Sequence, residues 1–527
     1  METEKFLYGA SVQGIQSFIF QTNELKDIVG ASELVEQICT DRFAQSIGKV
    51  NAEALKTDPN AILMAAGNIK YIFQESDKEK LENLIKKFPK TVIEAAPGIT
   101  VSQAVVKYRS DDNSPESENQ AFKSAINLLE KQLREQRNKP LRSSTLGIIG
   151  VMRSPKTGLP AVAIDDGEAI DLGTQKKRAS AHKGNKNSTK KLCEKSFGLP
   201  HLDHDQIAYD ITDMTDKNDW IAIIHADGNG LGQIVQKVGH LQKTFKEFSF
   251  LLNEATIIAA NNAYRAVVDW PDNVCIPLRP VVLGGDDMTL ICRASFAIQY
   301  TQTFISEFEK ETQKKLGRIL KDNHIFDDGS NKLTACAGIA FIKSSYPFYY
   351  GYNLAEELCT QAKKEAKKIN PMLAPSCIMF HKVQSSFVEE YSQIEKKELT
   401  ASGVSFKFGP YYLDKPQVTK NKEYWINHWS ISKLLNSVEA LNSEPCSSVK
   451  NSLREWTSLL INNPGLAKQK LERLKNLWKS RLVENDGQNA NKEILNFIEE
   501  VTTSNKFNAI PIYDLLALYS VQYQITK

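Results

Sequence analysis

The sequence lacks the features that mark membrane, secreted and disulfide-bonded proteins. No apolar run approaches the ~18 residues that a membrane-spanning helix needs, so we expect no membrane partner. The opening METEKFLYGASVQG has no charged segment followed by an apolar one, so we expect no secretory signal. The eight cysteines are scattered without a Cys-x-x-Cys pair, which is typical of reduced, buried thiols. These absences together predict a cytoplasmic protein.

An excess of charge of one sign is also absent. The formal net charge is +3, so no global field requires a nucleic-acid partner. Apolar residues make up 41% and charged residues 24%, which is an ordinary balance for a globular protein. The 527 residues are enough for three to four domains of about 150 residues each.

Residues 216–385 are predicted to form a ferredoxin-like domain. Short apolar runs indicate strands, and longer segments with helical apolar spacing lie between them. The predicted elements follow the order β-α-β-β-α-β-α-β: 220–226, 245–268, the hairpin 279–293, 296–316, 332–343, 352–368 and 376–383. The first six elements of this order define the ferredoxin-like arrangement, and the last helix and strand extend it.

Residues 1–140 repeat this order more loosely. The predicted elements are strand 5–12, helix 32–47, a hairpin over 61–74 that turns near Gly67 and Asn68, helix 78–88, strand 101–108 and helix 121–136. The similarity between the two regions lies in the order of elements rather than in residue identity. We therefore predict an α+β protein with two related ferredoxin-like domains.

Two further regions complete the predicted organisation. Residues 141–215 form an insert, in which the segment 174–195 carries eight Lys or Arg against one Glu and is interpreted as a basic, mobile loop. Such a loop can bind phosphate without reading sequence, although a solvated loop explains the composition equally well. Residues 386–527 are predicted to be mainly helical, with a small bundle over about 420–527 and a helix breaker at 463–465.

Three acidic residues stand where predicted strands end. Asp227 opens the run Asp-Gly-Asn-Gly-Leu-Gly after the strand 220–226. Asp286, 59 positions after Asp227, and Asp287 follow two glycines at a predicted hairpin turn. Either motif alone is a common loop or turn. In a ferredoxin-like sheet, however, the first and third strands are neighbours, so the three carboxylates are expected to converge on one point.

Clustered carboxylates repel one another unless a cation neutralises them. Carboxylate oxygens suit Mg²⁺ or Mn²⁺, and two such ions can activate a hydroxyl and stabilise a leaving pyrophosphate. The sequence therefore predicts a two-metal nucleotidyl transferase that uses ATP, with Asp227, Asp286 and Asp287 as catalytic residues and metal ligands. The expected step is in-line attack of a hydroxyl on an α-phosphate.

Residues near these carboxylates are candidates for nucleotide binding. Backbone N–H groups of a glycine-rich loop can approach phosphate oxygens, and lysines four positions apart on a helix can face a triphosphate together. By strand alternation, His225 shares a face with Asp227, although a packed strand histidine is the simpler interpretation. The candidates are Gly228, Asn229, Gly230, Gly232, Gly284, Gly285, Lys363, Lys367 and His225.

With these motifs in place, the sequence resembles the large polymerase/cyclase subunit of type III CRISPR effector complexes, nearest the Cmr type. The similarity covers nearly the whole chain. It is carried by the segments 12–39, 65–69, 157–162, 176–181, 227–232, 284–287, 355–368 and 408–413. The family's architecture implies two palm domains, the second with the Gly-Gly-Asp-Asp site, separated by an insert and followed by a helical domain.

The resemblance also implies an activity. The family joins ATP into cyclic oligoadenylate, or a related nucleotide messenger, when a complex of effector subunits and guide RNA binds target RNA. On this basis Asp227 and Asp286 ligate the metal ions, and Asp287 is a further ligand or assists the 3′-hydroxyl. The first palm would complete a second ATP pocket without a metal ligand, because Gly67-Asn68 stands where the second palm has Asp286-Asp287.

The sequence departs from the family pattern at three points. The first palm starts by about residue 5, so we expect no HD-type DNase activity from this chain. Of the cysteine-rich zinc site between the palms only one cysteine remains, and the irregular spacing of the nearby histidines gives no reason to expect zinc. The candidates for such a weak site are His182, Cys193, His201 and His204. Where many members have a second Asp in the first metal motif, this chain has Asn229, which keeps an oxygen but loses a charge.

Three alternatives remain open from the sequence. The same site could make a linear or mixed nucleotide, or join AMP to another small molecule. The chain could instead be a non-catalytic structural subunit of an RNA-guided complex with a vestigial palm. It could also act as a stand-alone nucleotide cyclase without partner subunits.

Overall fold

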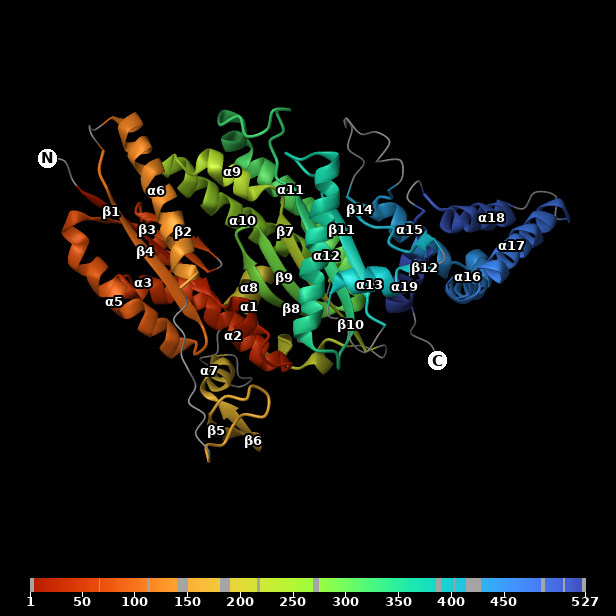
Figure 1. Ribbon diagram of the computed structural model, residues 1–527, viewed down its shortest axis with the longest axis horizontal. Helices are drawn as coiled ribbons and strands as arrows, with labels where there is room; N and C mark the ends of the chain where they lie inside the picture. The colour runs from red at the N-terminus through yellow and green to blue at the C-terminus, as the bar shows by residue number, and fades with distance from the viewer. Residues whose placement is uncertain are drawn as a thin grey trace. The chain divides into compact units, whose positions relative to one another are not determined.

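The computed structural model describes residues 4–65, 67–110, 114–139, 150–180, 190–215, 219–268, 274–384, 390–401, 403–413, 428–484, 489–505 and 508–523 (Figure 1). The chain forms two compact units. The first comprises Met1–Met214, Gly230–Ile291 and Glu307–Leu333, and the second comprises Thr215–Asn229, Cys292–Ser306 and Thr334–Lys527. Among the helices in these ranges, none combines the length and apolar character that crossing a membrane requires.

The first unit contains a four-stranded antiparallel sheet in the order β2-β3-β1-β4. Its strands are β1 (Lys5–Gln13), β2 (Ala61–Ala65), β3 (Asn68–Gln74) and β4 (Thr100–Tyr108). The helices between and after them are α2 (Leu25–Gln37), α5 (Lys78–Ala95) and α6 (Pro115–Arg137). This strand order is that of a ferredoxin-like sheet, as the sequence predicts.

Apolar packing explains why this sheet forms where the pattern predicts it. Leu7 and Tyr8 of β1 are fully buried, and Phe43 stacks on the Tyr8 ring with 6.1 Å between ring centroids. Each such side chain contributes about 1.5–3 kcal/mol through its burial. The predicted helix 32–47 is interrupted, because a π-helical turn (Ile38–Arg42) separates α2 from the short α3 (Phe43–Ser46).

A six-stranded sheet has the order β14-β11-β10-β7-β9-β8 (Figure 1). Its strands are β7 (Trp220–Gly228), β8 (Leu278–Gly284), β9 (Asp287–Arg293), β10 (Ala335–Lys343), β11 (Cys377–Lys382) and β14 (Tyr411–Tyr412). The connecting helices are α10 (Gln242–Val267), α11 (Ala297–Asp322) and α12 (Phe348–Ile369). All predicted elements of residues 216–385 are present, and β14 is an addition too short for its pattern to reveal.

Helix α12 lies directly against β10 and β7 in the second unit. A glycine in β10 makes this close approach possible, because a Cβ at Gly338 would lie only 1.9 Å from the Ala355 carbonyl oxygen. The strands below are apolar, and Ile223 and Ile339 are fully buried. The close contact holds the helix that carries Lys363 near the carboxyl-terminal end of β7.

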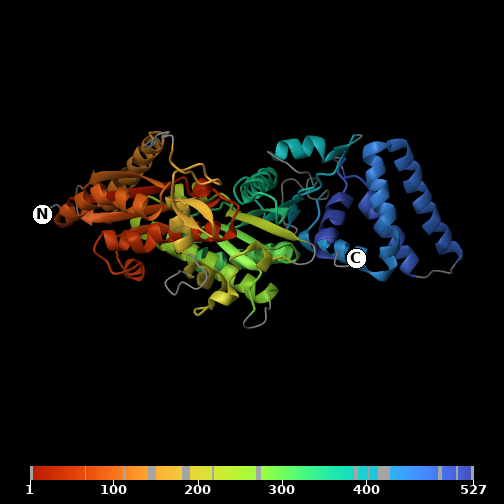
Figure 2. The same ribbon diagram turned by 90° about the horizontal axis from the view of Figure 1, so that it is seen from below.

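The C-terminal residues of the second unit are helical, as predicted. Helices α15 (Ile431–Asn442), α16 (Glu444–Asn462), α17 (Pro464–Glu484) and α18 (Asn489–Thr502) pack on one another in sequence, and Figure 2 shows several of them as blue coils lying side by side. A last helix, α19 (Ile512–Gln522), packs on α15 and β11. The sequence pattern does not reveal α19, because a helix that is apolar on nearly every face has no amphipathic period.

The prediction of a basic loop over 174–195 is wrong for the residues of this segment that the structure describes. Residues Leu172–Ser180 form helix α7 and Lys191–Phe197 form helix α8, whereas 181–189 lie outside the described residues. Lys177 is fully buried, with its ammonium 4.3 Å from the Phe18 ring centroid, and burial lowers its pKa to about 8. The basic residues of α7 therefore include two that belong to the interior of the first unit.

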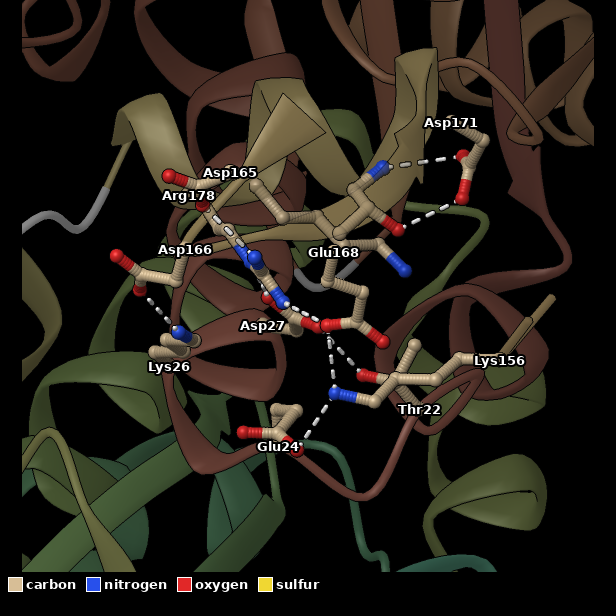
Figure 3. A network of polar contacts seen from close by, with 12 residues as sticks. Thr22, Glu24, Lys26, Asp27, Lys156, Asp165, Asp166, Glu168, Asp171 and Arg178 are labelled. Atoms are coloured by element: carbon tan, nitrogen blue, oxygen red, sulfur yellow. Dashed lines mark hydrogen bonds and ion pairs between the residues drawn. The ribbon is translucent and has the colours of Figure 1, made fainter. Parts of the chain in front are cut away.

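Arg178 is the second of these interior residues, and it pairs with three carboxylates (Figure 3). Its Nε lies 2.8 Å from Asp27, its Nη1 2.7 Å from Asp165 and its Nη2 3.6 Å from Glu168. Close packing supports the network, because a Cβ at Gly30 of α2 would lie 1.8 Å from the Lys177 carbonyl oxygen. Charge composition alone cannot distinguish such paired residues from a solvated basic loop.

Candidate active site

Asp227 lies near the carboxyl-terminal end of β7 and faces a lysine from α12. The Lys363 ammonium donates to the Asp227 carboxylate and to the Gly228 carbonyl oxygen, the latter at 2.9 Å. Lys363 is the more buried partner, with a side chain 19% exposed against 39% for Asp227. Burial lowers the pKa of Lys363, but the Asp227 carboxylate outweighs that effect and the pKa is raised overall. The lysine is thus charged and holds the end of the strand.

Asn229 forms hydrogen bonds with residues inside the fold. Its backbone N–H donates to the Thr334 carbonyl oxygen at 2.8 Å, and its side-chain amide nitrogen donates to the Thr334 hydroxyl at 3.1 Å and to the Ala374 carbonyl oxygen at 3.2 Å. The residue is only 6% exposed. Asn229 therefore braces the turn after β7 against the start of β10, which is work that needs an N–H donor and that an aspartate could not do.

The other candidates near β7 differ in accessibility. His225 is 7% exposed, its ring packs edge-on to Tyr352 at 5.8 Å, and burial lowers its pKa. Gly230 has a positive φ of 70° and caps helix α9 (Leu231–Val238). Gly232 is exposed, and a Cβ there would meet no atom within 4 Å. Lys367 is exposed one turn beyond Lys363 on α12.

The Gly-Gly-Asp-Asp segment forms the turn between β8 and β9. Gly284 ends β8, and Gly285 has a positive φ of 64°, which a glycine adopts without strain. Two hydrogen bonds to helix α10 hold this turn. The Gly285 N–H donates to Asn253 at 3.2 Å, and the Gly285 carbonyl accepts from the Thr256 hydroxyl at 2.5 Å. Asp286 and Asp287 follow at the mouth of the turn, both half-buried.

The sequence pattern does not identify several residues that support this turn. The Lys195 ammonium of α8 donates to the Leu283 carbonyl oxygen at 2.7 Å and pairs with Glu36 at 3.0 Å. Lys195, Asn253 and Thr256 bind the backbone of Leu283 and Gly285 from distant positions in the sequence. Only the helical spacing of Asn253 and Thr256, three positions apart, could have shown that these two share a face.

The candidates for a zinc site do not form one among the described residues. Cys193 is a fully buried thiol in α8 and burial raises its pKa to about 12, whereas His204 shares a hydrogen bond of 2.9 Å with the Tyr209 hydroxyl. His182 lies outside the described residues, and His201 is exposed. The chain does contain a His-Asp pair, the residue pair after which HD-type nucleases are named, at His204-Asp205 in a short 3₁₀ turn.

Within the part of the chain that the structure describes, no three or more His, Cys, Asp or Glu side chains are gathered to hold a metal ion. Asp227 belongs to the second unit and the Asp286-Asp287 pair to the first. In this structure the Lys363 ammonium supplies the positive charge beside Asp227. The donor set itself, three carboxylates without sulfur or imidazole, is the type that Mg²⁺ or Mn²⁺ prefers.

Comparisons with known proteins identify the class to which this site belongs. The family model for the second palm domain of Cas10/Cmr2 matches residues 220–371, a range that includes all three candidate carboxylates, Lys363 and Lys367. A search of curated proteins found no match. Residues 220–371 are therefore a palm domain of the Cas10/Cmr2 type.

Solved structures extend the similarity to nearly the whole chain. The Csm1–Csm4 cassette in complex with AMPPNP matches at 12% identity with a TM-score of 0.53, covering 99% of this chain and 70% of that one. The same cassette with pppApA matches at 12% identity and 0.51, covering 100% and 70%, and with cA4 at 13% and 0.50, covering 99% and 70%. These identities show a shared fold. The chain therefore contains a palm domain of the Cas10/Cmr2 type and shares its fold with a chain of the Csm1–Csm4 cassette.

Proposed function

We propose that the chain is the nucleotidyl transferase subunit of a type III CRISPR effector complex and makes cyclic oligoadenylate, or a related nucleotide messenger, from ATP. The observation that carries the proposal is the position of Lys363, whose ammonium lies beside Asp227 and the Gly228 carbonyl at the end of β7. A half-buried ammonium beside a carboxylate at a glycine-rich loop is suited to receive a phosphate group.

The strand order supports a common site for the three carboxylates. In the six-stranded sheet β7 and β9 are neighbours; Asp227 lies near the end of β7, and Asp287 begins β9 after Asp286. Adjacent antiparallel strands bring the end of one beside the start of the other. We infer that Asp227, Asp286 and Asp287 act together on one substrate.

The residues fit a divalent metal and a triphosphate. Asp227, Asp286 and Asp287 would hold Mg²⁺ or Mn²⁺, which would neutralise the developing charge on the reacting phosphate. Lys363 would then leave Asp227 for a phosphate oxygen, and Lys367, one turn further and exposed, would reach the distal phosphates. The N–H groups at the start of α9 could donate to a phosphate oxygen, and a Cβ at Gly232 would meet no atom within 4 Å.

The four-stranded sheet of the first unit would be a degenerate palm. Its β2-β3 turn has Gly67 at a positive φ of 86°, and the Gly67 carbonyl accepts from the Val12 N–H at 2.7 Å. Asn68 begins β3, as Asp287 begins β9, and it offers no negative charge to a metal. We propose that this domain binds a second ATP and supplies no metal ligand.

Partner subunits are proposed from the solved structures that share this fold. The relatives of known structure were solved as a Csm1–Csm4 cassette, in separate complexes with AMPPNP, pppApA and cA4. We propose that this chain likewise assembles with other type III effector subunits, and that guide and target RNA control it through that complex in the cytoplasm.

The test uses the complex assembled from the host subunits, with target RNA, ATP and Mg²⁺ or Mn²⁺. Asp286→Asn/Asp287→Asn should abolish nucleotide product, which mass spectrometry would identify as cyclic, linear or mixed. The matched control is Asp327→Asn/Asp328→Asn, because these exposed residues are another Asp-Asp pair in a turn. Product formed equally by the parent and the first variant would overturn the proposal.

One observation favours the second candidate function, a structural subunit without catalysis. Lys363 already neutralises Asp227, and the described residues contain no preassembled metal cluster. A vestigial palm predicts that ATP does not bind in the presence of Mg²⁺. Calorimetric titration of ATP·Mg²⁺ into the full chain distinguishes the two candidates, since the transferase requires binding that Asp286→Asn/Asp287→Asn weakens.

A further inference from the structure

Four basic side chains of the second unit gather around two aromatic rings. Lys343 ends β10, Lys382 ends β11, and Lys450 and Arg454 lie one turn apart on α16. The rings belong to Trp220, the first residue of β7, and to Tyr519 of α19. We call these six residues the basic cluster.

The contacts join the basic cluster into one group. The ammonium groups of Lys343 and Lys382 each lie 4.4 Å from the Trp220 ring centroid. The Lys382 ammonium also donates to the hydroxyl of Ser520, the neighbour of Tyr519. Two adjacent residues of α19 therefore connect the lysines at the sheet with the basic residues of α16.

The α16 half of the cluster surrounds the second ring. The Lys450 ammonium lies 4.2 Å from the Tyr519 ring centroid and donates to the Tyr519 hydroxyl at 2.6 Å, and the Arg454 guanidinium carbon is 5.8 Å from the same centroid. Both basic residues are half-buried. Their charges are thus held in place instead of being dispersed in solvent.

Three of the cluster's four basic side chains have no acidic partner among the described residues. Over the described ranges of the chain, no ion pair connects Lys382, Lys450 or Arg454 to a carboxylate. Burial, together with the charges of Lys343 and Arg454, lowers the pKa of Lys382 to about 8. Like charges at close range destabilise one another unless an anion is present. The ring faces compensate this repulsion only in part.

The basic cluster is separate from the candidate active site. Trp220 and Asp227 are the first and eighth residues of β7, which places them about 23 Å apart at the usual rise per residue of a strand. Lys343 pairs with Trp220 in register, and Cys336 pairs with Asp227, so β10 spans the same separation. A ligand at one end need not reach the other.

We propose that the basic cluster binds the phosphodiester backbone of a single-stranded nucleic acid. Four cations gathered around two rings offer several positive charges to neighbouring phosphates, which carry affinity without base specificity. A protein partner fits less well, because lysines are depleted from the cores of protein interfaces. Both rings are engaged by cations, so the cluster holds the backbone and does not stack bases. This inference does not depend on the proposed catalytic activity.

The test measures binding of labelled oligouridine to the full chain by fluorescence anisotropy at several salt concentrations. The variant Lys382→Met/Lys450→Met/Arg454→Met removes three charges and keeps most of each apolar stem. We expect its Kd to rise at least 10-fold, and the slope of log Kd against log salt to fall by about 2, since each contact to a single strand contributes about 0.7.

The matched control is Lys468→Met/Arg473→Met/Lys479→Met, which removes the same charges from exposed positions on α17. Its Kd should stay within about twofold of the parent value, because salt screens exposed charges that do not contact the nucleic acid. Equal weakening by both triple variants, or a cluster variant that binds like the parent, would overturn the proposal.

Two further arms separate binding from folding and from catalysis. Arg454→Lys keeps the charge and should bind like the parent, while an unchanged melting temperature shows that the triple variant is folded. Asp286→Asn/Asp287→Asn should also bind oligouridine normally, so a failure of the proposed transferase activity leaves this test intact. Equal affinity for oligodeoxythymidine would show that the backbone alone is recognised, whereas preference for RNA would add a 2′-hydroxyl contact.

Discussion

The Lys363 ammonium donates to both the Asp227 carboxylate and the Gly228 carbonyl oxygen, and so connects α12 to the end of β7. This single contact joins two sequence motifs that lie 136 positions apart. It also gives Lys363 a role that Lys367 does not share, although both belong to the same lysine-rich helix segment.

Lys363→Met is expected to weaken ATP use more strongly than Lys367→Met. A charge-assisted hydrogen bond contributes about 1.5–3 kcal/mol, so kcat/KM for ATP should fall about 10- to 100-fold. Replacing the exposed Lys367 should lower kcat/KM for ATP by less than about threefold, because water screens its charge. Steady-state product formation by the assembled complex measures both. Equal losses from the two variants would mean that the contact with Asp227 has no bearing on the site.

The sequence predicts the two sheets well because apolar periodicity records which side chains are buried. The runs around Ile223 and Ile339 are buried as their pattern requires, and the turn at Gly285 adopts the positive φ that suits a glycine. The candidate site is predicted less completely. Lys195 and Thr256 bind the backbone around Gly285 from remote parts of the chain, and no local pattern encodes such contacts.

Burial of charged groups is the other feature that the sequence could not show. A lysine- and arginine-rich segment has the same composition whether it is solvated or paired, and only the fold brings Asp27 and Asp165 to Arg178. Helix α19 was missed for a related reason, since continuous apolarity gives no amphipathic signal.

Asn229→Asp is expected to destabilise the protein instead of restoring an Asp-x-Asp motif. The Asn229 amide donates to the Thr334 hydroxyl and to the Ala374 carbonyl, and a carboxylate would face the carbonyl without a hydrogen to give. An unsatisfied buried group costs about 1–3 kcal/mol. Urea unfolding of the parent, Asn229→Asp and Asn229→Ala measures the loss. An aspartate variant as stable as the parent would contradict the inward role of this side chain.

Arg178→Met should strongly destabilise the first unit, whereas Lys176→Met on the same helix should change stability by less than about 0.5 kcal/mol. Replacing Arg178 leaves Asp27, which is fully buried, with the Thr22 hydroxyl as a neutral partner at 2.9 Å (Figure 3). Breaking a buried pair in this way costs about 3–5 kcal/mol. Thermal unfolding distinguishes this structural role from that of a loop that binds RNA. A loop would show no difference in stability between the two variants.

Asp514 of α19 is expected to make the stability of the second unit depend on pH. Its carboxyl accepts from the Tyr411 hydroxyl at 2.6 Å, and burial raises its pKa from 3.8 to about 7. Below pH 3.8 the group is protonated in both the folded and the unfolded state, so it contributes no difference. Between pH 3.8 and about 7 the unfolded state ionises first, so the free energy of unfolding falls as the pH rises.

Asp514→Asn cannot ionise, and its amide oxygen still accepts from Tyr411. The stability of this variant relative to the parent should therefore increase from pH 5 to pH 7, by about 1.4 kcal/mol for each pH unit, and level off above pH 7. Urea unfolding at a series of pH values gives the difference directly. The exposed Asp322→Asn, whose residue ends α11, is the control for replacing a carboxylate by an amide. A flat difference for Asp514→Asn would mean that the carboxyl is already ionised in the folded protein, since only a proton retained on folding produces the slope.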